Sequence, residues 1–133
     1  MEQERFQLLS SQDLKALEES SANSNTTKST NTWVRAYRAW ASARGKKINL
    51  EEYSPSELNE VLCNFYGELR RQDGKEYEPD SLRVMQASLH RYLSEKKYPK
   101  SIFSDIDFTS SNKVLEGKAR VLRQQGMGKR PNA

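Results

Sequence analysis

The only histidine of the chain lies in the stretch EYEPDSLRVMQASLHRYLSEKK, residues 76–97, between arginines that could share a binding surface with it. His90 follows Arg83 by seven residues, two turns of a helix, and directly precedes Arg91. Next to two cations, an imidazole is better suited to contact a phosphate or a base edge than to transfer a proton. The alternative is an ordinary surface histidine.

Other catalytic or metal chemistry has little support in the sequence. One histidine and one cysteine cannot supply a zinc ligand set, and the glycines of GMGKR follow no strand that would make them a phosphate loop. Cys63 lies at the edge of an apolar helix face, where we expect a packing residue and not a nucleophile. The sequence therefore predicts no metal, no cofactor and no catalytic residue, and a lone cysteine fits a reducing compartment.

Charge is distributed in alternating blocks along the 133 residues. The net charges are −3 for residues 1–25, +6 for residues 26–50, −6 for residues 51–80 and +7 for residues 81–133. Such blocks can give a folded domain one positive and one negative face, as attraction of a polyanion requires. The alternative is that folding spreads the charge evenly over a solvated surface.

Two predicted helices carry the basic residues away from their apolar stripes. Arg35 and Arg38 lie opposite the stripe Trp33, Ala36, Tyr37 and Trp40, whose aromatic rings we expect in the core. Small residues such as Ala87 keep the second helix slim, so that it could enter a DNA groove, where arginines contact phosphates and guanine edges. Small residues are equally tolerated on an ordinary surface helix.

Hydrophobic spacing predicts four or five helices and no strand pair, so the fold class is all-α. We expect a short helix at 10–20, a linker at 20–31, and helices at 30–44 and from 54 to about 71. The helix from 54 to about 71 begins with a capping box at Ser54 and Pro55. Further helices are expected from Pro79 and from Ser110 or Ser111 to Gly126. Between them, an irregular segment should be held to the core by Ile102, Phe103, Ile106 and Phe108.

Three stretches carry a family resemblance: SPSELN, LCNFYGELRRQDGKEY and SLRVMQASLHRYL. Residues 26–125 resemble the core-binding, SAM-like N-terminal domain of Crypton-derived tyrosine recombinase-like proteins, within the phage-integrase-like superfamily. Similar segments occur in vertebrate nuclear proteins with MYM-type zinc fingers and in a glutamine-rich relative. TNTWVRAYRAW is similar to the opening helix of phage-integrase-like core-binding domains.

The resemblance implies a four- to five-helix bundle that clamps duplex DNA in the nucleus. Transferred position by position, it places these residues on DNA: Thr32, Arg35, Arg38, Arg83, Gln86, Ala87, His90 and Arg91. It also implies three parts: an acidic segment with a short helix and linker at 1–25, the core-binding domain at 26–125, and a basic linker at 126–133. The recombinase catalytic domain would follow that linker, so this chain alone is not expected to cleave DNA.

Two functions remain open at the level of sequence. The first is double-stranded DNA binding by the two basic helices, without catalysis. The second is a protein-interaction module of a nuclear protein, which would dock a basic partner on the acidic helix at 54–71. No membrane contact is expected, and the sequence leaves the oligomeric state and the DNA target undetermined.

Overall fold

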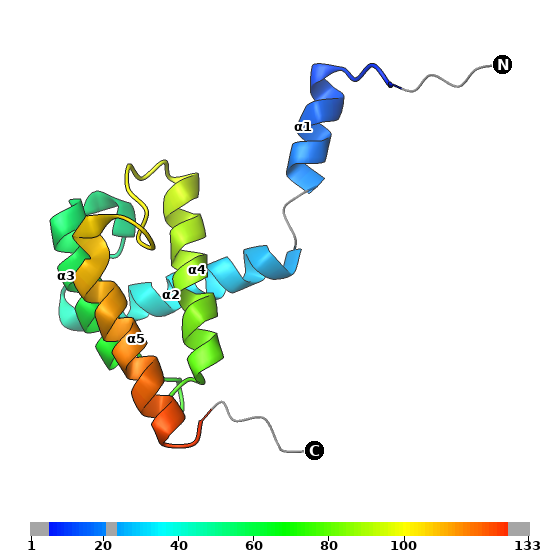
Figure 1. Cartoon of the computed structure of the whole chain (residues 1–133). Helices are drawn as coiled ribbons and strands as arrows, with labels where there is room; N and C mark the ends of the chain where they lie inside the picture. Colours follow the sequence, from blue (N-terminus) through cyan, green and yellow to red (C-terminus); the bar gives the residue numbers. More distant parts are fainter. Residues whose placement is uncertain (1–5, 21–23, 128–133) are drawn as a thin grey trace, which may run out of the picture.

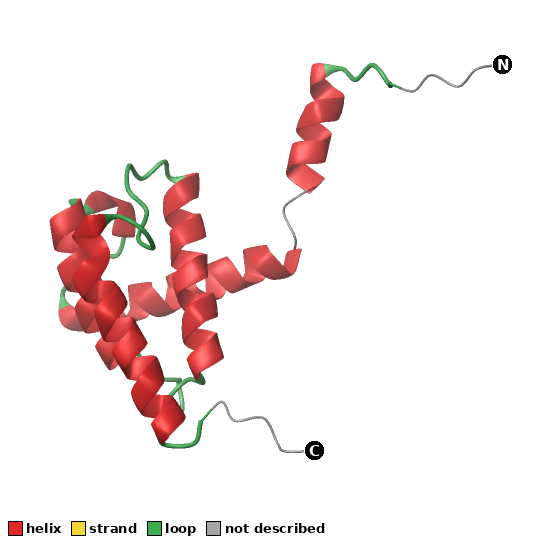
Figure 2. Cartoon of the chain, viewed as in Figure 1, coloured by secondary structure: helices red, strands yellow, loops and turns green. Residues whose placement is uncertain are grey.

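Helices account for all of the regular structure that is described. The computed structural model describes residues 6–20 and 24–127, and within them no strand occurs (Figures 1 and 2). The elements are α1 (Ser11–Ser20), α2 (Ser24–Arg44), the 3-10 turn η1 (Leu50–Glu52), α3 (Pro55–Glu68), α4 (Pro79–Glu95), the 3-10 turn η2 (Ile106–Phe108) and α5 (Thr109–Gln124). The predicted all-α class is confirmed.

Two pairs of helices form the body of the domain: α2 crosses α4, and α3 lies along α5 (Figure 1). Tyr37 of α2 and Phe65 of α3 join the pairs, with ring centroids 5.4 Å apart in an edge-to-face contact. The helix α4 also packs on α5. The completely or almost completely buried side chains are Tyr37, Leu50, Leu58, Leu62, Phe65, Tyr66, Leu82, Met85, Leu89, Leu93, Ile102 and Phe108.

The first turn of α3 has the predicted capping box. The Ser54 hydroxyl accepts a hydrogen bond from the Glu57 backbone N–H at 3.3 Å, and Pro55 occupies the first helical position. The helix ends at Glu68, three residues before the predicted end. The Lys118 ammonium group donates hydrogen bonds to the carbonyls of Tyr66 and Leu69 at 2.8 and 2.9 Å, which satisfies these carbonyls at the C-terminal end of α3.

The predicted linker at 20–31 is wrong for residues 24–31, because α2 begins at Ser24. Serine, threonine and asparagine are weak helix formers, but here they contact α4. The hydroxyls of Ser29 and Ser88 are 3.2 Å apart, and Thr30 is 5% exposed. Tertiary contact with α4 therefore extends the helix beyond its apolar stripe. Residues 21–23 of that linker lie outside the described residues.

Two of the four residues that were predicted to hold the segment before α5 to the core do so. Ile102 and Phe108 are fully buried, but the expectation is wrong for Phe103 and Ile106, which are 45% and 83% exposed. The Asp105 side chain accepts the Asp107 backbone N–H at 2.9 Å and begins the turn η2. The tight turn sends Phe108 inward and leaves Ile106 in solvent.

The two ends of the chain differ in how they relate to the body. Figure 1 shows α1, the predicted short helix, apart from α2–α5, and its Leu14 is 56% exposed. At the other end, α5 is followed by Gly126, whose φ of +90° suits glycine. Met127 packs against the core, so the C-terminal tail has an anchor that the sequence did not indicate. Of the predicted segments at 1–25 and 126–133, residues 1–5 and 128–133 lie outside the described residues.

Candidate nucleic-acid interface

The crossing of α2 and α4 gathers cations from both helices around one shallow hollow of about 380 Å³. Arg35 and Arg38 line it from α2, and Lys96, directly after α4, lines it from the other side. Glu95 is the acidic residue in the same lining. The hollow thus brings three cations together with one carboxylate.

Tyr92 supports two of these cations at the floor of the crossing. The Arg38 guanidinium carbon and the Lys96 ammonium nitrogen lie 5.9 and 5.7 Å from the centre of its ring. The Tyr92 hydroxyl donates to both carboxylate oxygens of Glu51 at 2.7 Å, and Arg38 lies 3.5 Å from the same hydroxyl. Burial, reinforced by Glu51, raises the pKa of Tyr92. These contacts hold the Tyr92 ring in place, and its hydroxyl keeps its proton.

Arg91 of α4 is bonded to Thr30 of α2, which lines the same hollow. One of its terminal nitrogens lies 3.2 Å from the Thr30 hydroxyl and 3.5 Å from the Thr26 carbonyl, both on α2. The hydroxyl of Thr30 itself donates to the Thr26 carbonyl at 3.0 Å. These contacts place a half-buried arginine against the helix that carries Arg35 and Arg38. We name Arg35, Arg38, Arg91 and Lys96 the crossing patch.

Two other residues transferred from the family lie at a different junction, between α4 and α5. Arg83 is exposed there, beside Arg120 and Arg123 of α5. Gln86 is only 8% exposed, and its amide nitrogen donates to the Asn112 side-chain oxygen at 2.7 Å. The structure therefore separates Arg83 and Gln86 from the crossing patch, and it gives Gln86 an internal partner.

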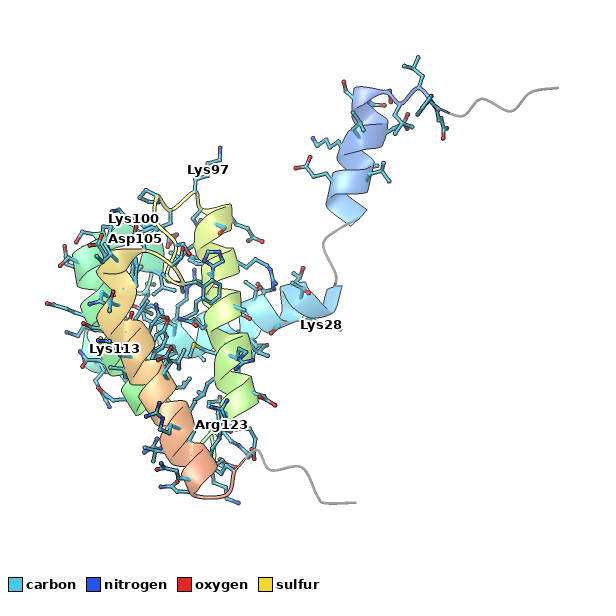
Figure 3. The ribbon with its side chains drawn as sticks, in the orientation of Figure 1. Lys28, Lys97, Lys100, Asp105, Lys113 and Arg123 are labelled. Atoms are coloured by element: carbon cyan, nitrogen blue, oxygen red, sulfur yellow. The ribbon has the colours of Figure 1, made fainter. Side chains whose placement is uncertain are left out.

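The remaining residues transferred from the family are spread over α2 and α4. The His90 ring, half-buried, packs on Phe103 with centroids 4.6 Å apart. Ala87 is partly exposed. The Thr32 hydroxyl, although exposed, donates to the Lys28 carbonyl of its own helix at 2.8 Å. Figure 3 shows Lys28 on the N-terminal part of α2, which projects from the body.

Lys96, Arg120 and Arg123 are surface residues that sequence reasoning missed. Lys96 lies just beyond α4, and its place beside Arg38 depends on the angle at which the two helices cross. The net charge of residues 81–133 included all three. Residue spacing within one helix, however, cannot show which cations of two different helices come together.

The aromatic and cysteine side chains behave as packing residues. Trp33 is 8% exposed and contacts Tyr77 with centroids 4.9 Å apart, and Trp40 contacts Phe65 at 5.4 Å. The predicted place in the core is confirmed for Trp33, whereas Trp40 is partly buried and packs against the core. Burial, followed by the nearby Glu60, raises the pKa of the Cys63 thiol, which disfavours the reactive thiolate.

The described part of the chain holds neither a cluster of metal-ligand side chains nor a helix that could span a membrane. Within residues 6–20 and 24–127, no three histidine, cysteine or acidic side chains cluster in a way that could hold a metal ion. Over the same residues, each helix is too short or too polar to cross a membrane.

With this arrangement known, comparison with other proteins decides the family. Residues 16–121 match the QRICH1 domain, which covers most of the chain. The chain belongs to the QRICH1 domain family. No solved structure matches it.

The relatives of this QRICH1 domain are much longer proteins. The mouse protein named KIAA1958 homolog and human KIAA1958, both described as uncharacterized, are each 34% identical over 117 residues. The match covers 86% of this chain but 16% of either relative. The chain therefore spans about a sixth of the curated relatives that it matches.

Shorter matches connect this QRICH1 domain to zinc-finger proteins. Human zinc finger MYM-type protein 3 is 38% identical over 53 residues, which is 40% of this chain and 4% of that protein. Human zinc finger MYM-type protein 2 is 30% identical over 77 residues, or 58% of this chain and 5% of that protein. These matches confirm the resemblance to MYM-type zinc-finger proteins, and none of them concerns a tyrosine recombinase or a Crypton element.

Proposed function

We propose that this QRICH1 domain binds double-stranded DNA through the crossing patch. The observation that carries the proposal is that Arg35, Arg38 and Lys96 line one hollow where α2 and α4 cross, next to Arg91, which is bonded to the Thr30 hydroxyl of the same lining. Cations at this spacing can neutralise neighbouring phosphates and release their counterions, which is the main source of affinity for duplex DNA. Base reading would be limited to Arg35 and its exposed neighbours on α2.

The internal contacts of the patch also favour binding. Arg38 and Arg91 are held by Tyr92 and Thr30, so they lose less side-chain freedom on meeting a phosphate than solvated arginines would. The carboxylates of Glu51 and Glu95 reduce the positive potential, but Glu51 is engaged by the Tyr92 hydroxyl. We therefore expect moderate, strongly salt-dependent affinity.

The finer assignment is also part of the proposal. We infer that this domain acts as the core-binding part of a nuclear, Crypton-derived tyrosine recombinase-like protein. This assignment is supported by the quoted sequence segments, and the MYM-type zinc-finger relatives support only its nuclear part. In such a protein, strand exchange belongs to a separate domain, so the chain described here would bind DNA without cutting it.

Fluorescence anisotropy with a labelled 20-base-pair duplex of random sequence tests DNA binding. If about four phosphates are neutralised, the logarithm of the association constant should fall with the logarithm of salt with a slope of about −4. Arg35→Glu/Arg38→Glu should weaken binding at least about tenfold and make the slope shallower. The matched control is Lys75→Glu/Lys113→Glu, which changes the net charge equally; Figure 3 shows Lys113 on α5.

The two double variants separate a specific surface from general charge. Equal weakening by both would mean that only the net charge matters, and the crossing patch would lose its role. Affinity that does not change with salt, or no binding at micromolar protein, would contradict the proposal directly. Circular dichroism spectra of both variants should match that of the unmodified chain, because all four positions are exposed.

A second candidate function is docking of a basic protein partner on α3. It is favoured by Glu60, an exposed carboxylate that makes no ion pair with the described residues. A lysine-rich peptide should bind the unmodified chain and lose affinity with Glu60→Lys. If the peptide binds both proteins equally, this candidate fails.

A further inference from the structure

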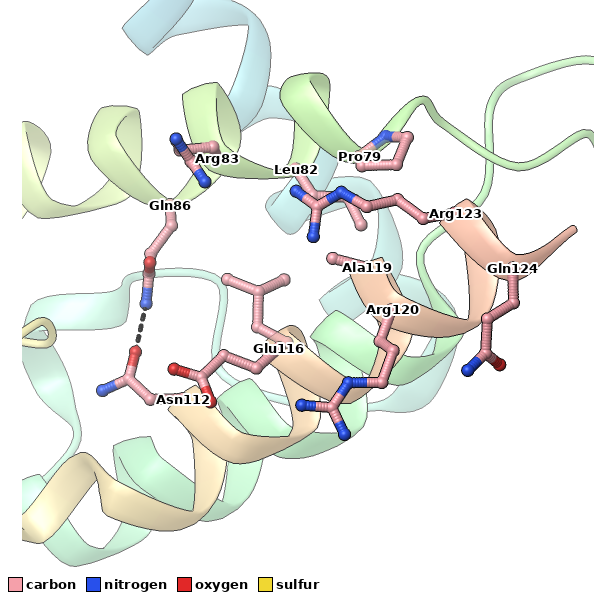
Figure 4. Close-up of a pocket in the computed structure, with 11 residues that line it drawn as sticks. Pro79, Leu82, Arg83, Gln86, Asn112, Glu116, Ala119, Arg120, Arg123 and Gln124 are labelled. Carbon is pink, nitrogen blue, oxygen red and sulfur yellow. Dashed lines mark hydrogen bonds between the residues drawn. The ribbon is translucent and has the colours of Figure 1, made fainter. Parts of the chain in front are cut away.

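The N-terminal half of α4 and the length of α5 from Asn112 to Gln124 border a partly open cavity of about 600 Å³ (Figure 4). Its floor is apolar: Leu82 of α4 is 1% exposed, and Leu115 of α5 is 8% exposed. Ala119 adds a small side chain one turn farther along α5. The opening is therefore deep enough to receive a side chain and lined to favour an apolar one.

Three arginines surround this floor. Arg83 comes from α4, and Arg120 and Arg123 come from α5. All three are exposed, and none forms an ion pair with the described residues. Figure 4 shows the Arg123 side chain reaching from α5 toward Leu82 of α4. The one acidic residue in the lining is Glu116, so the rim of the cavity is positive.

Hydrogen bonds join the elements that line one end of the cavity. Gln86 donates to Asn112 across the cavity at 2.7 Å, as the dashed line in Figure 4 marks. The Asn112 amide nitrogen in turn donates to the carbonyls of Ile102 and Phe108 at 3.0 and 2.9 Å. These contacts tie α4, α5 and the intervening segment together at one end of the cavity, which lowers the cost of ordering this end on binding.

We propose that this cavity binds an acidic peptide segment of a partner protein, which places one bulky apolar side chain on the floor and carboxylates on the arginines. Two features select this partner: an apolar floor that rewards burial of a hydrocarbon side chain, and unpaired guanidinium groups that match carboxylates. The proposal goes beyond DNA binding, because Arg120 and Arg123 lie outside the crossing patch.

Duplex DNA fits this cavity less well than a peptide. Its surface presents phosphates and no protruding apolar group, so it would leave the cavity unfilled. Glu116 lies within the lining and would repel a phosphate placed there. A peptide can direct its carboxylates to the arginines and keep them away from Glu116.

The test uses synthetic peptides and the full chain. The probe is the fluorescein-labelled peptide Asp-Glu-Glu-Leu-Phe-Glu-Asp, and its binding is followed by fluorescence anisotropy. A second peptide replaces Leu-Phe with Gly-Ser, and a third replaces every acid with lysine. The first peptide should bind with a Kd below about 100 μM, at least about tenfold tighter than the second, and the third should not bind.

Two variants examine the rim and the floor separately. Arg120→Glu/Arg123→Glu reverses the rim and should weaken peptide binding at least about tenfold. Ala119→Trp fills the cavity without changing the charge and should have a similar effect. The control Lys75→Glu/Lys113→Glu carries the same charge change as the rim variant and places one reversal on α5, so it should bind the peptide nearly normally.

DNA binding provides the readout that separates this inference from the proposed function. Arg120→Glu/Arg123→Glu should keep DNA affinity close to that of the charge control, and Arg35→Glu/Arg38→Glu should keep peptide affinity. The inference is overturned if the Gly-Ser peptide binds as well as the probe, because attraction would then be purely electrostatic. It is also overturned if the duplex displaces the peptide and the rim variant loses DNA, or if no peptide binds at 100 μM.

Discussion

Gln86 is a polar residue that the fold itself requires. Its amide is the hydrogen-bond donor to Asn112, and a Gln86→Leu variant would leave the part-buried Asn112 oxygen without this donor and beside an apolar group. Loss of one partner in a buried pair costs about 1–3 kcal/mol. We expect Gln86→Leu to lower the free energy of unfolding in urea by that amount. The matched control is the exposed Gln72→Leu, which should have little effect.

If Gln86→Leu proves as stable as the unmodified chain, the bond to Asn112 is not structural. DNA affinity of the folded Gln86→Leu protein should be unchanged, because the side chain faces α5 and not the crossing patch. The family resemblance placed Gln86 on DNA from its position in one helix, whereas the contact with Asn112 depends on a helix 26 residues later.

Lys118 gives the stability of the domain a specific pH dependence. Burial, assisted by the nearby charge of Arg70, lowers the pKa of its ammonium group to about 8. The pKa of a lysine in the unfolded chain is about 10.4. Between these values the unfolded chain binds more protons at this residue than the folded chain does. Stability contributed by Lys118 must therefore increase as pH rises through this window.

The corresponding prediction compares the unmodified chain with Lys118→Met. Methionine removes the donor to the Tyr66 and Leu69 carbonyls, so the variant should be less stable at every pH. The difference in unfolding free energy, measured in urea, should be larger at pH 9.5 than at pH 7. The comparison cancels the titration of the tyrosines, which both proteins share. A constant difference would show that folding does not shift the pKa of Lys118, and a difference that shrinks would show that the fold stabilises the ammonium form; either result contradicts the prediction.

At the scale of elements, the start of α3 depends on one hydroxyl. Ser54→Ala removes the acceptor for the Glu57 backbone N–H and should lower the unfolding free energy by about 1 kcal/mol. Ser56→Ala, on an exposed position inside the helix, is the control and should be neutral or slightly stabilising. Thermal denaturation followed by circular dichroism measures both. Equal effects of the two substitutions would contradict the capping role.

The sequence predicted helices well where capping residues and apolar spacing within the same helix determine them. The capping box at Ser54 and the apolar stripe with Trp33 and Tyr37 depend on spacing within a few turns, and the structure has both. The start of α2 was missed because Ser29 and Thr30 gain their helical conformation from α4, which no local pattern reveals. The end of α3 was missed because Lys118 is supplied from α5.

The candidate site was predictable only in part, for the same reason. Helical spacing identified α2 and α4 as the basic helices and directed Arg35 away from the core. It could not show that Arg91 bonds to α2, that Lys96 joins Arg38 over Tyr92, or that Arg83 belongs with two arginines of α5. Each of these facts follows from how two helices cross.

In the whole molecule, the alternating charge blocks become separate surfaces. Basic residues of α2 and α4 meet at the crossing patch, and those of α4 and α5 meet around the cavity. The helix α3, with Glu57 and Glu60 exposed, belongs to the other helix pair. If both proposals hold, the two basic surfaces would allow the domain to contact DNA and an acidic peptide at the same time.

Backbone amide shifts observed by NMR during addition of a 20-base-pair duplex test the central claim most directly. With ¹⁵N-labelled chain, the largest shift changes should fall at Arg35, Arg38, Arg91 and Lys96, and α3 should remain unaffected. Changes concentrated on α3 or around the α4–α5 cavity, or no change at the crossing patch with excess duplex, would contradict it.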